Sequence, residues 1–222
     1  MTSFPFKIVG FDLDGTLLDT SGDLGMALNY TLRRIGRPEV PLDQVSNLIG
    51  GGARMMLDRA LALTGGTDGL DKKALHHVLL TYYEANIAVH SCLYPGTEAM
   101  LDDLANRDVK LAVVTNKMER LARHLLDTLG LTQRFVTIIG GDTLGPGRAK
   151  PEPDMVLEMI SRLGGGRAAF VGDTTYDTRA ASAAGIPCVG VSFGFLDAPL
   201  EQLGATATIS HYDKLIPTLM QI

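Results

Sequence analysis

Short apolar runs that end in polar residues recur along the chain and predict the strands of a sheet. Four runs have this form, at residues 6–11, 110–114, 168–172 and 187–191. The polar residues that directly follow them are Asp12, Thr115, Asp173 and Ser192. Apolar runs of this length bounded by turn residues are typical of buried strands. Each predicted strand therefore carries polar groups at its carboxyl end.

Helical patterns lie between the later runs. They cover residues 117–129, 152–163 and 176–184, and the glycines that stop them are Gly130, Gly164 and Gly185. Weaker strand signals lie at residues 135–139 and 206–210. Strands that alternate with helices favour a parallel sheet covered on both faces, because each crossover between parallel strands needs a helix. The sequence predicts the α/β class.

The interval from about residue 18 to residue 90 breaks this alternation. It offers helical patterns at residues 21–35, 42–49, 53–64 and 71–90, and it has no convincing strand. Leu57, Leu61 and Leu63, beside Met56 and Ala60, supply an apolar face at helical spacing. We expect an α/β core formed by residues 1–17 and 92–222, with residues 18–91 inserted as a helical cap after the first strand.

Composition narrows the possible partners. The 222 residues are 45% hydrophobic and 20% charged, with a formal net charge of −5, so no broad basic field marks a nucleic-acid surface. No apolar run approaches the ~18 residues that cross a bilayer, and the opening residues lack a leader pattern. Cys92 and Cys188 fit neither a disulfide framework nor a metal motif. We expect a cytoplasmic monomer or homodimer that binds neither nucleic acid nor membrane.

Two aspartates follow the first predicted strand, and their spacing suits phosphoryl chemistry. Asp12 and Asp14 flank a single leucine at the strand end. Transfer of a phosphoryl group needs a nucleophile, an acid for the leaving oxygen and positive charge near the phosphate oxygens. One carboxylate can attack while the other donates a proton. Taken alone, the segment is equally well a turn that caps the next helix.

Other strand ends supply further candidate groups. Thr115 and Asn116 offer a hydroxyl and backbone N–H groups that can bind phosphate, or alternatively a helix cap. Lys150, just before Pro151, offers a cation that can keep a neighbouring aspartate ionised. Asp173 and Asp177 straddle a predicted turn from strand to helix. Together with Asp12 and Asp14 they form an oxygen-rich set of the kind that Mg²⁺ prefers.

These four segments, taken in order, resemble the haloacid dehalogenase-like hydrolases, and within them the branch of the phosphoglycolate phosphatases. They are Asp12-Leu13-Asp14-Gly15-Thr16, Val113-Val114-Thr115-Asn116-Lys117, Lys150-Pro151-Glu152-Pro153-Asp154 and Gly172-Asp173-Thr174-Thr175-Tyr176-Asp177. The resemblance spans nearly the whole chain. It implies a Rossmann-like parallel sheet of strand order 3-2-1-4-5 with the helical insertion as its cap.

The resemblance also implies a role for each residue. Asp12 would be the nucleophile and a metal ligand, and Asp14 the general acid and then base. Thr115 would bind the phosphate, and Lys150 would be its electrostatic partner. The implied Mg²⁺ ligands are Asp12, the main-chain carbonyl of Asp14, and Asp173, with Asp177 in or just outside this set. An aspartate at position 14 favours an oxygen leaving group over a halide, because halide needs no proton.

The substrate is inferred from a segment of the insertion. Ile49-Gly50-Gly51-Gly52-Ala53-Arg54 resembles the cap segment that faces the pocket in phosphoglycolate phosphatases. Gly51 would let the backbone approach a small substrate, and Arg54 would pair with a carboxylate; a flexible turn with an exposed arginine explains the segment equally well. The hypothesis is hydrolysis of 2-phosphoglycolate. The alternatives are a phosphatase or mutase for another small phosphate or a pyrophosphate, a phospho-accepting regulatory module, and a binding protein without activity.

Overall fold

A six-stranded parallel sheet forms the centre of the protein. The computed structural model describes residues 4–222, so the first three residues of the expected segment 1–17 lie outside the described part. The sheet order is β5-β4-β1-β6-β7-β8. Its strands are β1 (Ile8–Phe11), β4 (Lys110–Val114), β5 (Thr137–Ile139), β6 (Ala168–Gly172), β7 (Cys188–Val191) and β8 (Ala207–Ile209). The expected α/β class and order of five strands are confirmed, and β8 adds a sixth strand beside β7.

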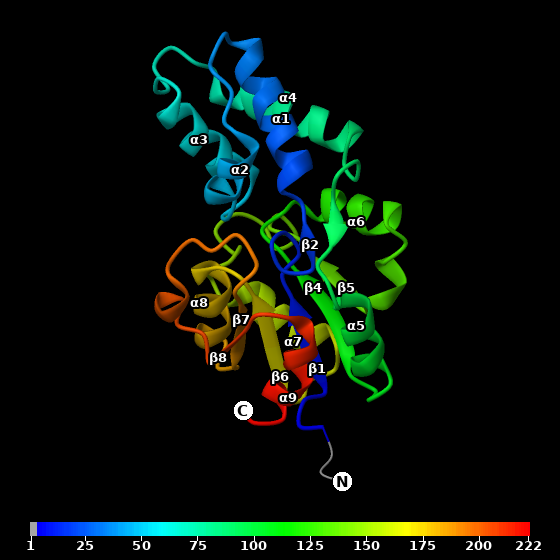
Figure 1. Ribbon diagram of the computed structural model, residues 1–222. Helices are drawn as coiled ribbons and strands as arrows, with labels where there is room; N and C mark the ends of the chain where they lie inside the picture. The colour runs from blue at the N-terminus through cyan, green and yellow to red at the C-terminus, as the bar shows by residue number, and fades with distance from the viewer. Residues whose placement is uncertain (1–3) are drawn as a thin grey trace.

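Helices cover both faces of the sheet (Figure 1). Side chains of successive strand residues point to opposite faces, so Val9 packs in one apolar cluster and Ile8 in another. The cluster of Val9 includes residues of α5 (Thr97–Ala105), α6 (Glu119–Thr128) and α9 (Leu215–Leu219). The cluster of Ile8 includes residues of α7 (Asp154–Arg162) and α8 (Thr175–Ala183). Burial on both faces explains why the strands are apolar throughout rather than alternating.

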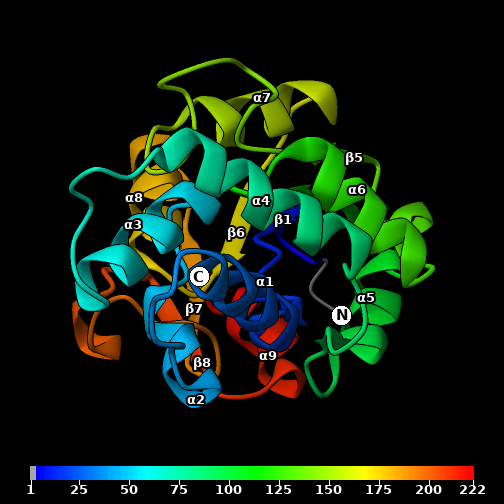
Figure 2. The same cartoon turned by 90° about the horizontal axis from the view of Figure 1, so that it is seen from above.

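A layer of helices lies beyond the carboxyl ends of the strands (Figure 1). Its members are α1 (Ser21–Arg34), α2 (Leu42–Val45), α3 (Ala53–Leu63) and α4 (Lys72–Ala85). Leu28, Leu57 and Leu79 are fully buried where these helices face one another. Leu63, expected on the same apolar face, is instead 71% exposed because it is the last residue of α3. Figure 2, viewed from above, shows α1, α3 and α4 lying across the ends of β1 and β6. The helices of this layer therefore cover any cavity at this edge of the sheet.

The chain enters and leaves the helical layer through two short strands that lie together. β2 (Leu18–Asp19) pairs antiparallel with β3 (Cys92–Leu93). The buried carboxylate of Asp23 accepts hydrogen bonds from the backbone N–H of His90 at 3.0 Å and from the backbone N–H and hydroxyl of Ser91 at 2.9 and 2.7 Å. A charged acceptor with several donors fixes both connections to the start of α1.

Some predicted boundaries differ from the structure. The expected helix at residues 42–49 is the four-residue α2 followed by a 3₁₀ turn, Ser46–Leu48. The expected helix at 71–90 ends at Ala85, where the side-chain amide of Asn86 donates to the carbonyl of Tyr82. The predicted stops at Gly130, Gly164 and Gly185 are confirmed, with φ angles of 70°, 85° and 74°. Within residues 4–222, none of the helices combines the length and apolar character needed to cross a membrane.

Candidate active site

Strand order brings the predicted site residues to one place. β1 lies between β4 and β6 and is parallel to both, so their carboxyl ends meet at one edge of the sheet. Asp12, Thr115 and Asp173 directly follow these strands and are all buried. The strand order reverses at β1, with β4 and β5 on one side and β6, β7 and β8 on the other, and open α/β sheets bind ligands at such a point.

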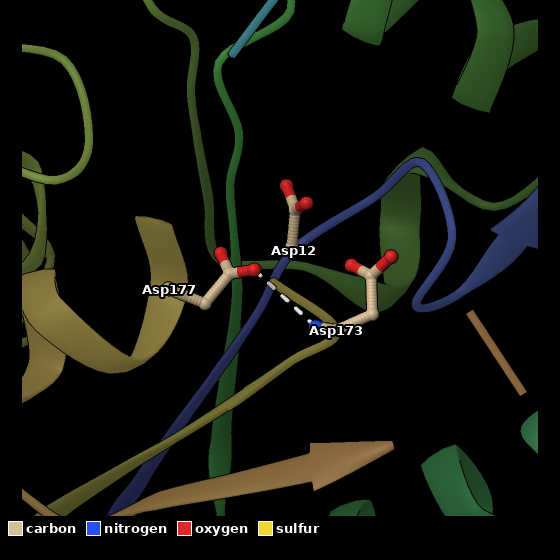
Figure 3. Close-up of side chains that lie close together, drawn as sticks. All are labelled: Asp12, Asp173 and Asp177. Carbon is tan, nitrogen blue, oxygen red and sulfur yellow. Dashed lines mark hydrogen bonds between the residues drawn. The ribbon is translucent and has the colours of Figure 1, made fainter. Parts of the chain in front are cut away.

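Three carboxylates gather at this edge. Asp12, Asp173 and Asp177 each offer an oxygen that lies within 4.8 Å of the other two. Figure 3 shows the carboxyl groups of Asp12 and Asp173 side by side above the strand ends, with Asp177 reaching them from α8. Like charges at this separation repel strongly when water is excluded, so the cluster requires compensating positive charge.

Lys150 supplies part of that charge. Its Nζ lies 2.9 Å from Oδ1 of Asp12 and 2.6 Å from Oδ1 of Asp177, and it donates to the carbonyl of Val114 at 2.8 Å. The residue is only 3% exposed. Burial alone would lower the pKa of Lys150, but Asp12 and then Asp177 raise it above its ordinary value. Lys150 is therefore a permanent cation in the site.

One ammonium does not balance three carboxylates. Burial, with further repulsion from Asp177 and Asp14, raises the pKa of Asp12 to about 6 despite the opposing effect of Lys150. Burial, followed by Asp177 and Asp12, also raises the pKa of Asp173 well above its ordinary value. The Lys150 contact of Asp12 is an ion pair without the alignment of a hydrogen bond, so its Oδ1 has no hydrogen-bond partner among the described residues. A free buried carboxylate oxygen and excess negative charge fit a divalent cation.

The other two carboxylates differ in how their oxygens are used. Asp173 accepts one hydrogen bond at each oxygen, from the hydroxyl of Thr16 at 2.9 Å and the N–H of Phe195 at 2.6 Å. Asp177 accepts three at Oδ2, from the N–H of Asp173 and from the N–H and hydroxyl of Thr174, in a capping box that starts α8. Its remaining oxygen accepts from Lys150. Asp173 thus keeps lone pairs for a cation, whereas Asp177 mainly orients its neighbours.

Glycine is required directly after the second aspartate of the turn, Asp14. Gly15 has a φ of +84°, and a Cβ at this position would lie 2.2 Å from Oδ2 of Asp173. Both the left-handed backbone and the lack of space exclude a larger residue. The turn can therefore bring its backbone against Asp173 only because residue 15 has no side chain.

The side chain of Asp14 is not part of the three-carboxylate cluster and has partners of its own. Its oxygens lie 2.7 and 2.8 Å from Nζ of Lys117, and the hydroxyl of Thr20 donates to Oδ1 at 2.8 Å. Lys117 is 8% exposed. The sequence analysis gave Lys117 no role, although it closes one of the four motifs. Its position at the end of that motif was the available signal.

Thr115 and Asn116 form the wall opposite Asp173. The Thr115 hydroxyl accepts from the N–H of Lys117 at 3.2 Å, which orients it at the end of β4. The Asn116 side chain donates to the carbonyl of Lys150 at 2.9 Å, while its Oδ1 is buried without a partner in residues 4–222. Asn116 thereby connects the turn after β4 to the segment that carries Lys150.

A cavity of about 700 Å³ opens above these residues. Asp12, Thr115 and Lys150 form its floor, and residues of α3 and α4 line the other side. The loop Gly50–Gly52 lies between, and a Cβ on Gly52 would be 3.3 Å from the carbonyl oxygen of Asn116. Gly51 and Arg54 both line the cavity, and Arg54 is exposed at its rim. All the predicted site residues therefore lie in or beside a single cavity.

Arg59 shapes the glycine loop and was missed in the sequence analysis. Its Nη1 lies 3.0, 3.1 and 3.3 Å from the carbonyl oxygens of Leu48, Ile49 and Gly50. These carbonyls belong to the end of the 3₁₀ turn and the residues after it, where the helix leaves acceptors unused. The sequence shows only an arginine on the polar side of a helix, so its target was not predictable.

Comparison with known proteins gives a consistent result. Residues 9–191 match the sequence model of the family described as haloacid dehalogenase-like hydrolase. The chain is 40% identical to a phosphoglycolate phosphatase of Agrobacterium fabrum, covering 100% of this chain and 96% of that protein. It is also 40% identical to one of Caulobacter vibrioides, covering 92% and 86%. A crystal structure of a predicted phosphoglycolate phosphatase from Haemophilus somnus superposes with a TM-score of 0.89 at 28% identity, covering 96% and 97% of the two chains.

Burial of Asp12, with further repulsion from the neighbouring carboxylates, predicts a specific pH dependence of stability without metal. Because the folded-state pKa of Asp12 is raised to about 6, its contribution to stability is complete below the ordinary pKa of an aspartate and is lost as pH rises through about 6. Asp12→Asn is neutral at every pH. In a chelating buffer, its free energy of unfolding relative to the wild type should rise by on the order of 3 kcal/mol between about pH 4 and pH 8.

Urea unfolding followed by circular dichroism at several pH values measures this difference. Asp68→Asn, in an exposed loop, is the control and should follow the wild type throughout. A difference between Asp12→Asn and the wild type that stays constant with pH would show that the carboxylates are not strained in the folded state.

Proposed function

The chain belongs to the haloacid dehalogenase-like hydrolase family and is a phosphatase, and from this premise we propose that it hydrolyses 2-phosphoglycolate to glycolate and phosphate through an aspartyl-phosphate on Asp12. Relatives named phosphoglycolate phosphatase cover nearly the whole chain. The observation that carries the mechanism is the buried Oδ1 of Asp12, which has no hydrogen bond and lies 2.9 Å from a permanent cation at the floor of the cavity.

Asp12 is the proposed nucleophile. Its carboxylate oxygen forms a bond to phosphorus while the bond from phosphorus to the ester oxygen breaks. Lys150 lies against this carboxylate and offsets charge as the phosphoryl group transfers. The Thr115 hydroxyl and the turn through Asn116 lie at the adjacent strand end, where they bind the phosphate oxygens. Thr115, Asn116 and Lys150 thus hold the phosphoryl group beside the Asp12 carboxylate before the attack.

Asp14 is the proposed acid and base. It donates a proton to the departing ester oxygen, releasing glycolate, and later accepts one from the water that attacks phosphorus of the aspartyl-phosphate. Phosphate then leaves and the Asp12 carboxylate is restored. In the structure the Asp14 carboxylate contacts Thr20 and Lys117. It must exchange these partners for the ester oxygen during the reaction.

We propose Mg²⁺ as the cofactor, held by Asp12, Asp173 and the main-chain carbonyl of Asp14. Excess negative charge and the oxygen donors of the cluster support this choice. When bound, Mg²⁺ neutralises the carboxylates and the phosphate oxygens that approach them. Asp177 orients this set through its bonds to Thr174, Asp173 and Lys150.

Residues 18–91 are the proposed cap over the catalytic core of residues 1–17 and 92–222. The helical layer over the cavity and the paired connections β2 and β3 support this division. Gly51 brings the cap backbone close to the substrate, and Arg54 at the rim pairs with the substrate carboxylate when the cap closes. The cavity of about 700 Å³ also has room for larger substrates, so sugar phosphates are the natural competitors in an assay.

The remaining proposals concern the cellular setting. The two cysteines are unpaired, with Cys188 buried, which supports a reducing, cytoplasmic compartment. The net charge of −5 supports a small-molecule partner rather than nucleic acid. A monomer or a homodimer serves the mechanism equally, because every proposed group comes from a single chain.

Activity should depend on Mg²⁺ and favour 2-phosphoglycolate. A panel of phosphorylated metabolites, including sugar phosphates and pyrophosphate, is assayed for released phosphate. Chelation should abolish turnover because the carboxylate cluster repels the substrate, and added Mg²⁺ should restore it. Full activity in metal-free enzyme would remove the metal from the mechanism. A faster reaction with another ester would leave the chemistry intact and change the substrate.

Two isosteric variants separate the roles of the paired aspartates. Asp12→Asn loses the nucleophile, so rapid-quench labelling with ³²P-labelled substrate should give no phosphoenzyme. Asp14→Asn keeps the attacking carboxylate but lacks the proton donor, so turnover should fall by roughly 10²–10⁴-fold. Peptide mapping of the wild-type label should identify Asp12. Label that survives Asp12→Asn at wild-type yield would refute covalent catalysis at this residue.

Arg54→Ala should impair a carboxylated substrate more than an uncharged aryl phosphate. Closure of the cap excludes water and strengthens a guanidinium–carboxylate contact. Its loss should cost on the order of 1–3 kcal/mol, or roughly 5- to 150-fold in kcat/KM for 2-phosphoglycolate. Kinetics on both compounds give the answer, with the aryl phosphate as the control for general damage. Equal losses would make Arg54 a structural residue of the cap.

A further inference from the structure

Besides Lys150, the cavity is lined by another cation that is much less exposed than Arg54. Lys117 lines the cavity from the turn after β4 and is 8% exposed. The lining of the cavity also includes the apolar side chains of Leu24, Leu79, Leu80, Met118 and Leu121. An ammonium in such surroundings attracts an anion far more strongly than an exposed guanidinium does. The mechanism above gives Lys117 no role beyond its contact with Asp14.

Tyr83 faces the same point from the helical layer. It belongs to α4, lines the cavity and is 1% exposed. Its ring centroid lies 4.7 Å from Nζ of Lys117. Its hydroxyl oxygen is buried without a hydrogen-bond partner in the described part of the chain. A buried hydroxyl without a partner destabilises the protein, so the O–H of Tyr83 is available to donate a hydrogen bond to a bound anion.

The position of these two groups relative to Asp14 defines what they can reach. The ester oxygen of a bound substrate faces the Asp14 carboxyl, since that group protonates it. Nζ of Lys117 lies 2.7 Å from the same carboxyl. In 2-phosphoglycolate the carboxylate carbon is only two bonds from the ester oxygen. A substrate carboxylate therefore comes within reach of Lys117 as soon as the ester oxygen meets Asp14.

We propose that Lys117 and Tyr83 together bind the carboxylate of the leaving group, with Lys117 exchanging Asp14 for the substrate and Tyr83 donating a hydrogen bond. This inference rests on the proposed carboxylated substrate. It assigns specificity to a pair that spans the core and the helical layer, one residue from each. It also links recognition to chemistry, because the incoming carboxylate takes the lysine that holds Asp14 away from the ester oxygen.

The test compares 2-phosphoglycolate with its neutral isostere, carbamoylmethyl phosphate, with Mg²⁺ present. The quantity of interest is the ratio of the two kcat/KM values, since loss of the Asp14 contact affects both esters. Lys117→Met should reduce the wild-type preference for the carboxylate by about 10- to 100-fold. Tyr83→Phe, which removes one oxygen, should reduce it by about 3- to 10-fold.

Neighbouring residues provide matched controls. Tyr82→Phe makes the same change one residue away, where the ring stacks on Tyr30 at 4.4 Å. Lys73→Met removes an exposed lysine from the same helix, α4. Both controls should keep the wild-type ratio. Equal losses on the two esters in Lys117→Met and Tyr83→Phe would overturn the proposal and leave Lys117 as a positioning residue for Asp14.

Two further results complete the design. If Lys117→Met is too slow to assay, calorimetry measures the affinities for both esters in Asp12→Asn and in Asp12→Asn/Lys117→Met. An affinity ratio of the two esters that is the same in both proteins overturns the proposal. If Lys117→Met does not fold, the Tyr83→Phe ratio decides. A wild-type enzyme with no preference for the carboxylate defeats the proposed substrate itself. A clear wild-type preference that survives both variants defeats only the role of Lys117 and Tyr83.

Discussion

The excess of negative charge at one edge of the sheet is the constraint on which the rest of the site depends. Asp12, Asp173 and Asp177 are buried together, and Lys150 balances only part of their charge. Such a cluster is costly in the absence of a cation, and the raised pKa values of Asp12 and Asp173 express that cost. The surrounding fold has to be stable enough to hold the carboxylates together.

Several surrounding features hold the carboxylates of this cluster together. The capping box of α8 fixes Asp177 while it satisfies the helix terminus, so the orientation of Lys150 follows from the start of a helix. Gly15 gives the turn after β1 the space to approach Asp173. The sheet supplies the remaining geometry, because the register of β1 with β4 and β6 places three strand ends at the same level. Local hydrogen bonding and sheet topology thus determine the same arrangement.

The sequence revealed the parts of the protein that depend on local pattern. The strands β1, β4, β6 and β7 are apolar runs with polar ends, and their glycine-stopped helices have a clear period. The nine-residue α5 was not predicted, although Met100, Leu101 and Leu104 have helical spacing in the sequence. The two-residue strands β2 and β3 are too short to show alternation.

The site residues that escaped the sequence analysis depend on contacts between distant segments. Lys117 meets Asp14 across 103 positions, and a lysine after a strand is ordinarily exposed. Tyr83 has the spacing of a core aromatic, and only the structure shows its hydroxyl without a partner.

Arg59 donates to the carbonyls of a loop about ten residues earlier in the chain. These hydrogen bonds determine how long a segment must be if this loop is to be transferred to another protein. A graft of Gly50–Gly52 alone would separate the loop from the guanidinium that holds its carbonyls, whereas the segment from Leu48 to Arg59 carries its own support and forms a transferable module.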